Sequence, residues 1–125
     1  LMYTQENVRK LFMQRGEIEM ELKVRQARYY GREEEMPREE AARILELKQE
    51  LLTIDGLFAA LSENEAFVIR HHVMEELDWP QTMVLFAQKW GADVEKSIRS
   101  MKALQEKGSR KVARILNKRI NHDLL

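Results

Sequence analysis

Apolar residues recur at helical spacing along most of the chain, so the pattern predicts helices separated by short polar breaks. The first helix is expected from Thr4, an N-cap residue, to about Tyr30, with Gly31 suited to the position after a helix. Its apolar residues fall on two lines, which indicates contact on more than one side. The lines are Val8, Leu11, Ile18, Leu22 and Tyr29, and Met13, Met20, Val24 and Ala27.

A second long helix is expected to follow Pro37, which suits a first helical turn. Its apolar positions alternate gaps of three and four residues, the spacing of a heptad seam. Together the two helices predict an N-terminal antiparallel hairpin over residues 1–60. The seam either packs inside this hairpin or pairs with a second chain to form a homodimer. Its members are Ile44, Leu47, Leu51, Ile54, Phe58 and Leu61.

Residues 61–125 are expected to form a C-terminal domain of shorter helices. Ser62 and Glu65 have the spacing of a capping box, and Leu61 precedes them as an apolar staple. This is the clearest boundary in the sequence. The inner face of the helix that follows is expected at Ala66, Ile69, Val73 and Leu77.

Three further helices are expected, and glycine marks the ends of two of them. The first begins at Asp78 or Trp79 and ends at Gly91, with Met83, Phe86, Ala87 and Trp90 on one face. The second begins with Asp93 as its cap and stops at Gly108-Ser109, and the third occupies the remaining residues. Their apolar positions are Val94, Ile98, Met101 and Leu104, then Val112, Ile115, Leu116 and Ile120.

The helices on either side of Gly91 have the parts of a helix-turn-helix: a supporting helix, a tight turn and a second helix with a basic outer face. Lys96 and Arg99 are long enough for guanine edges or phosphates, and a helix N-terminus such as that near Gln81 favours phosphate. An ordinary helical hairpin in a bundle is the alternative. The predicted DNA-contacting residues are Gln81, Thr82, Lys89, Glu95, Lys96, Arg99, Ser100, Lys102, Arg110 and Lys111.

The formal net charge of the 125 residues is zero, but the charge is unevenly distributed. Residues 1–88 carry 11 Lys and Arg against 17 Asp and Glu, whereas residues 89–120 carry 10 against 3. A concentrated basic surface of this kind displaces counterions from phosphates. The other interpretation is that the basic third pairs with acidic helices of a neighbour.

Several classes of protein do not fit the sequence. There are no cysteines, which excludes disulfide scaffolds and thiolate zinc sites and is consistent with the cytoplasm. No run approaches the roughly 18 apolar residues of a membrane span, and no signal pattern is expected at the N-terminus. No nucleophile with a base, phosphate loop or carboxylate pair is evident, so neither an enzyme nor a cofactor or metal site is expected.

Two pairs of aromatic or histidine side chains are expected to pack rather than to bind. His71 and His72 are adjacent, and adjacent residues on a helix point in different directions, so they cannot easily chelate one ion. Trp79 and Trp90 flank a short helix and are expected to anchor its core.

The stretch from Leu61 to Leu104 resembles region 4 of bacterial sigma factors, and more closely the small phage and prophage regulators of the ArpU and RinA kind. The segments that carry the resemblance are LSENEAFVI, LDWPQTMVLFAQKWG and ADVEKSIRSMKAL. It implies a sequence-specific transcriptional regulator that binds double-stranded DNA through residues 93–107 and contacts RNA polymerase. One departure is that Ile98 falls one position later than the family pattern when counted from Phe86.

The sequence therefore predicts an all-α protein in which a helical hairpin precedes a sigma-region-4-like helix-turn-helix and a basic C-terminal helix. Two other interpretations remain open. One is a protein–protein interaction module that works through the 44–61 seam. The other is a phage small terminase subunit, which also joins a helix-turn-helix to long helices.

Overall fold

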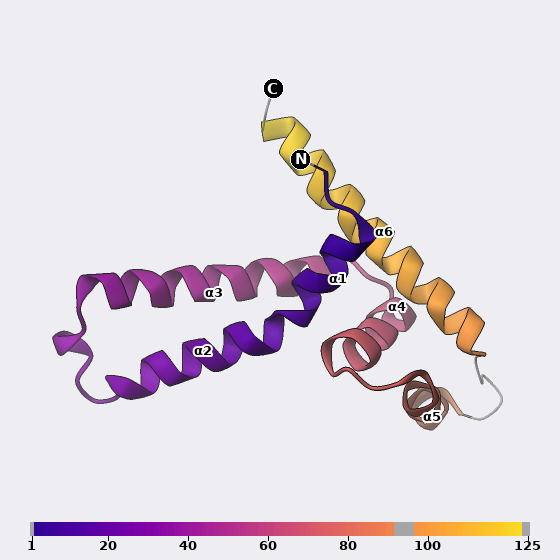
Figure 1. The fold of residues 1–125 in the computed structure, drawn as a ribbon, viewed down its shortest axis with the longest axis horizontal. Helices are drawn as coiled ribbons and strands as arrows, with labels where there is room; N and C mark the ends of the chain where they lie inside the picture. Colours follow the sequence, from indigo (N-terminus) through magenta and orange to yellow (C-terminus); the bar gives the residue numbers. More distant parts are fainter. Residues whose placement is uncertain (1, 92–96, 124–125) are drawn as a thin grey trace.

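The computed structural model describes residues 2–91 and 97–123, and every regular element in these ranges is a helix, which confirms the all-α class. Figure 1 shows an arm of two long helices, α2 and α3, projecting from a body where the other helices meet α6. No helix in the described ranges is long and apolar enough to cross a membrane. The elements are α1 (Gln5–Met13), α2 (Arg15–Arg28), the 3₁₀ turn η1 (Glu33–Glu35), α3 (Arg38–Phe58), α4 (Glu63–Val68), the π-helix η2 (Ile69–Met74), α5 (Trp79–Trp90) and α6 (Ile98–Asp123).

Helix starts and ends are encoded locally. Thr4, Ser62 and Asp78 each accept a hydrogen bond from the backbone amide three residues later, at 3.2, 3.2 and 2.8 Å. The side chain of that third residue accepts a hydrogen bond from the cap's own amide in return, so all three are capping boxes. The predicted caps Thr4 and Ser62 are thus confirmed, and of the two residues expected to cap α5 the cap is Asp78. Gly31 and Gly91 have φ values of +77° and +91°, a region that favours glycine, and they follow α2 and α5 as expected.

The single helix predicted for residues 4–30 is two helices, because the chain bends at Gln14. Before the bend, Val8 and Phe12 are buried in the body. After it, Leu22 is buried in the arm. The first apolar line thus serves two separate cores, because Val8 faces the body and Leu22 faces the arm, and the bend lets each helix face its own. The second line is not buried: Met20 and Val24 are 68% and 50% exposed.

The predicted seam is filled within the chain. Ile44 and Leu47 of α3 pack against Leu22 of α2, and the two helices run in opposite directions along the arm (Figure 1). Farther along α3, Ile54 and Leu57 are buried in the body. The seam therefore needs no second chain to be covered.

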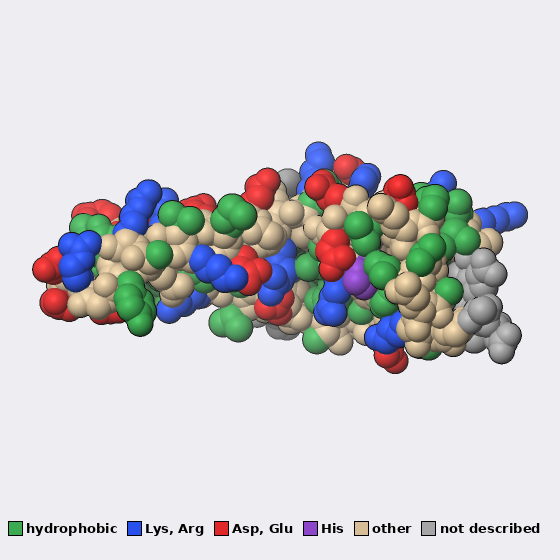
Figure 2. Space-filling model, turned by 90° about the horizontal axis from the view of Figure 1, so that it is seen from below, with side chains coloured by type: hydrophobic (Ala, Val, Ile, Leu, Met, Phe, Trp, Pro, Cys, Tyr) green, Lys and Arg blue, Asp and Glu red, His purple; other side chains and the backbone are tan. Residues whose placement is uncertain are grey.

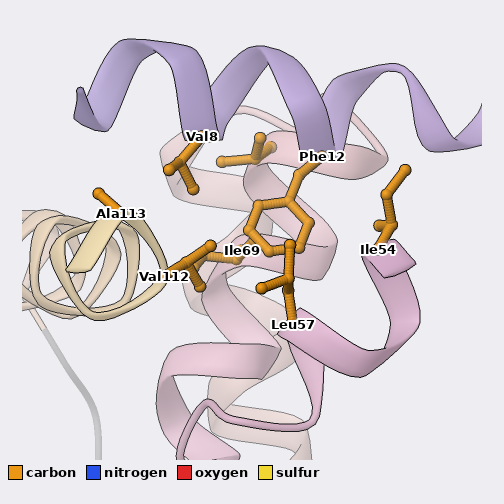
Figure 3. Packing of buried hydrophobic residues seen from close by; sticks show 8 residues of the cluster. Val8, Phe12, Ile54, Leu57, Ile69, Val112 and Ala113 are labelled. Atoms are coloured by element: carbon orange, nitrogen blue, oxygen red, sulfur yellow. The ribbon is translucent and has the colours of Figure 1, made fainter. Parts of the chain in front are cut away.

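One core joins the two predicted domains. Figure 3 shows the ring of Phe12 from α1 among side chains of α3, η2 and α6. This cluster crosses the boundary predicted between residues 60 and 61, so residues 1–60 and 61–125 share one core in addition to the clusters that lie within each range. Its buried members are Val8, Phe12, Ile54, Leu57, Ile69, Val73, Val112 and Ala113.

A second cluster holds α5 between α4 and the beginning of α6. Val68, Phe86 and Met101 are its buried members, and Leu104 packs beside them. Ile98 was expected in the same buried stripe, but it is 38% exposed, so that prediction is wrong. The reason is that α6 begins at Ile98, and its first turn lies ahead of the cluster.

The helix predicted across residues 63–77 changes character at Ile69, where the π-helix η2 begins. A π-helix has a wider turn, which shifts every later side chain around the axis. Ile69 and Val73 are buried as predicted, whereas Ala66 and Leu77 are only half-buried. The segment ends at Glu76, whose φ of +58° is left-handed and unusual for a residue other than glycine.

The stop predicted at Gly108-Ser109 is wrong, because α6 runs through both residues without a break. Both are buried against the body. A Cβ atom on Gly108 would lie 2.8 Å from Ile69 Cδ1 and 3.3 Å from Leu61 Cδ2. The glycine therefore permits a close approach of α6 to α4, and packing offsets its helix penalty of about 1 kcal/mol.

We expect Gly108→Ala to destabilise the protein, although alanine is the better helix former. The added methyl would meet the fully buried Ile69, and we expect the free energy of unfolding to fall by about 1–2 kcal/mol. The matched control is Gly56→Ala in α3, where nothing lies within 4 Å, and there we expect a gain of up to about 1 kcal/mol. Urea unfolding measures both, and a gain in both variants would contradict the close approach.

An ion-pair network stabilises the arm. Glu21 on α2 lies 2.8 Å from Arg25 Nε and 2.9 Å from Arg43 Nε, and Arg25 also reaches Glu40 at 2.8 Å. Hydrogen bonds from Arg43 and Arg25 lower the pKa of Glu21 from 4.5 to about 2. Since the folded pKa is depressed, the network's contribution to stability is present above pH 4.5 and is lost as the pH falls toward 2.

We therefore expect Glu21→Gln to lower the melting temperature at pH 7. The difference from the unchanged protein should close as the pH falls from 4.5 toward 2, because protonation then removes from the unchanged protein the charge that the variant already lacks. Thermal unfolding followed by circular dichroism across this range measures the difference. The control is Glu34→Gln in η1, an exposed carboxylate with no ion pair among the described residues. A gap that stays constant with pH would contradict the network.

Candidate nucleic-acid interface

One face of α6 is packed against the body and another is lined with exposed basic side chains. Figure 1 shows α6 running along one side of the body, with α1 near its middle and α5 near its N-terminal end. Its buried residues are Met101, Gly108, Ser109, Val112 and Ala113. We call the exposed residues Arg99, Lys102, Lys107, Arg110, Arg114 and Lys118 the basic face of α6.

Helical geometry gathers these side chains into a stripe. At 3.6 residues per turn, Arg99, Arg110 and Arg114 fall within an arc of about 60°, and the other three lie on either side of that arc. The stripe from Arg99 to Lys118 is about 28 Å long at the ordinary rise of an α-helix. Glu106 lies on the same face, 3.5 Å from Arg110, but both side chains are 59% exposed, and such pairs contribute little.

Sequence reasoning left Lys107, Arg114 and Lys118 out of the predicted contacts. It ended the recognition helix at residue 107 and treated Gly108 as a stop. Because α6 is continuous, these residues extend the same basic face that Arg99 begins. The signal that could have found them is the helical spacing of basic residues across the glycine.

The predicted recognition helix, residues 93–107, is only partly described. Arg99, Ser100 and Lys102 are exposed, as predicted for recognition residues. Ser97 Oγ accepts a hydrogen bond from the Ser100 amide at 3.1 Å, as an N-cap hydroxyl does. The predicted cap Asp93, the stripe residue Val94 and the predicted contacts Glu95 and Lys96 lie outside the described residues.

Lys111 was predicted to contact DNA, and its position corrects that prediction. Its Nζ atom lies 2.7 Å from Oε1 of Glu65, a residue 46 positions earlier whose side chain is almost fully buried. The same carboxylate oxygen accepts a hydrogen bond from the Ser62 amide at 2.8 Å. Lys111 thus ties α6 to the start of α4, and its charge is already neutralised.

The electrostatics of this pair have a clear direction. Burial raises the pKa of Glu65, but Lys111 and the backbone amide of Ser62 outweigh that effect and hold the pKa below its usual value. The carboxylate is therefore charged near neutral pH. A buried charge of this kind is costly without its partner.

The N-terminus of α5 does not offer a phosphate site. The Gln81 amide donates to Asp78 Oδ1 at 2.8 Å, and the Asp78 carboxylate places a negative charge at this helix end. Thr82 is fully buried, and its hydroxyl donates to Asp78 O at 2.9 Å. The prediction that Thr82 contacts DNA is wrong, and the exposed Gln81 side chain is occupied in the capping box.

Lys89 is exposed on α5 but is already engaged by α4. Its Nζ atom lies 3.3 Å from Glu63, and it sits 4.8 Å from the ring centre of Trp90 and 5.5 Å from that of Phe67. The Lys89 side chain remains 47% exposed, so these contacts orient it without burying it.

The histidines and tryptophans pack, as the sequence predicted. His72 stacks on Trp79 with ring centres 3.5 Å apart, and burial lowers the pKa of His72. His71 Nδ1 lies 2.7 Å from Glu75, and its ring meets Phe67 edge-on. Trp79 and Trp90 both pack against the second cluster, so their rings hold α5 in place.

Comparisons with protein families, with curated proteins and with solved structures return no match to this chain. Function is therefore inferred from the geometry of α6 and its surroundings. Of the predicted contacts that the structure describes, three are exposed without being held in a cap or in a pair with another helix or the body: Arg99, Lys102 and Arg110.

We expect Lys111→Met to reduce stability and to leave any ligand contact on the basic face unchanged. The variant leaves the Glu65 carboxylate buried without its cation, and we expect the free energy of unfolding to fall by about 2 kcal/mol. Urea unfolding at pH 7 measures the loss. Lys107→Met, an exposed lysine one turn earlier, is the control and should change stability by less than about 0.5 kcal/mol. Equal losses would contradict the assignment of Lys111 to the core.

Proposed function

We propose that the protein binds double-stranded DNA through the basic face of α6 and acts as a transcriptional regulator. The observation that carries this proposal is a stripe of six exposed Lys and Arg residues on one face of a helix whose opposite face is fixed in the core. Such a stripe presents cations at a spacing suited to a phosphate backbone, and phosphate contacts dominate affinity for DNA.

The dimensions support a helix in or along a groove. The major groove of B-DNA is about 12 Å wide and admits an α-helix. The first turns of α6 present Arg99, Ser100 and Lys102 together, a combination that reads base edges and phosphates. Arg110, Arg114 and Lys118 follow on the same helix and serve as phosphate contacts that fix its orientation.

The resemblance of residues 61–104 to sigma region 4 supports a regulatory role, of the phage or prophage kind, with RNA polymerase as a second partner. The packing is compatible with it. Val68 from α4, Phe86 from α5 and Met101 from α6 share one small core, as the three helices of such a unit require. Gly91 lies at the end of the supporting helix, where the turn was expected.

An interaction module that works through the 44–61 seam is the less well supported alternative, because three of the six seam residues are buried. Ile44, Leu47 and Ile54 are buried against the chain itself. The small terminase alternative has a simple discriminator, because such subunits form rings. A mass measurement in solution that gives a large ring would favour it over a regulator.

The experiment is selection of bound duplexes from a random pool, followed by titration of the selected site at several salt concentrations. We expect Arg110→Ala with Arg114→Ala to reduce the slope of log affinity against log salt by about 2. The slope falls because each lost phosphate contact releases about one fewer counterion. Arg99→Ala should cost about 1–3 kcal/mol and relax the selected sequence at one position.

The matched control is Arg38→Ala with Lys48→Ala, which removes the same charge from exposed positions on the arm. It should leave the salt slope unchanged. Absence of binding at low salt, or an equal effect of the arm control, would refute DNA binding by α6.

A further inference from the structure

The outer side of α2 carries an apolar stripe that the described chain does not cover. Met20 is 68% exposed and Val24 is 50% exposed, and Ala27 lies beside them. At helical spacing these positions face directly away from Leu22, which packs against α3. Figure 2 shows hydrophobic side chains exposed among charged ones along the arm.

Two hollows follow this stripe. The larger, of about 510 Å³, lies where α1 bends into α2 and is lined by Met13, Met20 and Met74 among others. The smaller, of about 350 Å³, continues along α2 between Met20 and Arg28. They share Met20 and Glu17, so together they form one shallow channel, which we call the α2 groove.

The α2 groove has opposite charges toward its two ends. Glu17 lines it near the N-terminus of α2 and Arg28 near the C-terminus. Eleven residues separate them, which returns to nearly the same side of a helix. Neither side chain forms an ion pair with another residue of the described ranges. Lys10 and Glu76, of opposite charge, also line the hollow near Glu17, and Glu21 and Arg25 pair with each other between the two ends. Within the described ranges, the unpaired charges that α2 itself contributes are therefore acidic at one end and basic at the other.

We propose that the α2 groove is filled by α2 of a second copy of this chain, running antiparallel about a two-fold axis. A two-fold interface must match itself, and a helix with opposite charges at its ends matches its own antiparallel copy. When Met20 of one copy packs on Val24 of the other, Glu17 of each copy comes within one residue of Arg28 of the other. Both carboxylate–guanidinium pairs then form together.

The same register accounts for Tyr30. It is 87% exposed, the most exposed large apolar side chain of the described residues, and it lies two residues beyond the end of α2. In the antiparallel pair, Tyr30 of the second copy comes level with Gln14, at the larger hollow lined by Met13 and Met74. Methionine side chains adapt their shape and contact aromatic rings favourably.

The interface is small. α2 is about 21 Å long, so a pair of such helices with Tyr30 at each end lies at the low end of interface size. We expect reversible, micromolar association rather than a permanent dimer. Dimerisation through α2 and DNA binding through α6 are independent of each other. A protein that binds DNA as a monomer would contradict the dimer alone, and a dimer that does not bind DNA would contradict only the proposed role of α6.

The test is a charge swap on the full chain, read by sedimentation velocity over a range of concentrations. Glu17→Arg alone and Arg28→Glu alone each place like charges across the interface, and we expect each to raise the dimer dissociation constant by about tenfold. The double variant restores both pairs and should regain most of the association. Leu52→Glu, at a 72% exposed position on α3, is the control and should change nothing. A protein that is monomeric at all concentrations, or a double variant as weak as the singles, would overturn the proposal.

Cross-linking fixes the register. The chain has no cysteine, so introduced thiols are unique. A mixture of Met20→Cys and Val24→Cys proteins should form a disulfide-linked heterodimer faster than Met20→Cys mixed with Leu52→Cys. Equal rates for the two mixtures would overturn the antiparallel register.

Discussion

The close approach of α6 to α4 at Gly108 determines how the rest of the body is arranged. With no side chain at that position, the α6 backbone lies against Ile69, and the buried core extends along α6 to Val112. The ion pair of Lys111 with Glu65 lies one turn farther along and fixes the rotation of α6 about its axis. Once the inner face is fixed in this way, the direction of every exposed basic side chain on the helix follows from the helical repeat.

Much of the fold follows from local signals, and the rest depends on long-range packing. Thr4, Ser62 and Asp78 were identifiable as caps because a capping box needs only four neighbouring residues. The bend at Gln14 was not, because it depends on two separate cores that bury Val8 and Leu22 of the same apolar line. The same division holds for the candidate site. The exposed positions of Arg99 and Arg110 could be predicted from helical spacing. The polar side chains of Thr82 and Lys111 instead form hydrogen bonds within the body, which spacing alone does not reveal.

The chain uses its arginines in two ways. On the arm, Arg25 and Arg43 lie against carboxylates of the same or the facing helix, so their charges hold α2 and α3 together. On α6, acidic neighbours are scarce, and Arg99 and Arg114 form no ion pair within the described residues. Arginine therefore joins two helices of the arm through ion pairs, whereas on α6 it presents a positive charge to the solvent. The difference arises from the placement of glutamate rather than of arginine.

The arm joins the body at two places, the bend at Gln14 and the stretch of α3 near Ile54 and Asp55. The bidentate contact of Arg15 with Asp55, at 2.8 and 3.3 Å, lies at this root. All of the body's buried core is on the near side of it, so the distance from root to tip does not enter the stability of the body. The length of the arm can therefore vary independently of the body. Matched turns added to α2 and α3 would move the tip of the arm outward and leave the position of α6 unchanged.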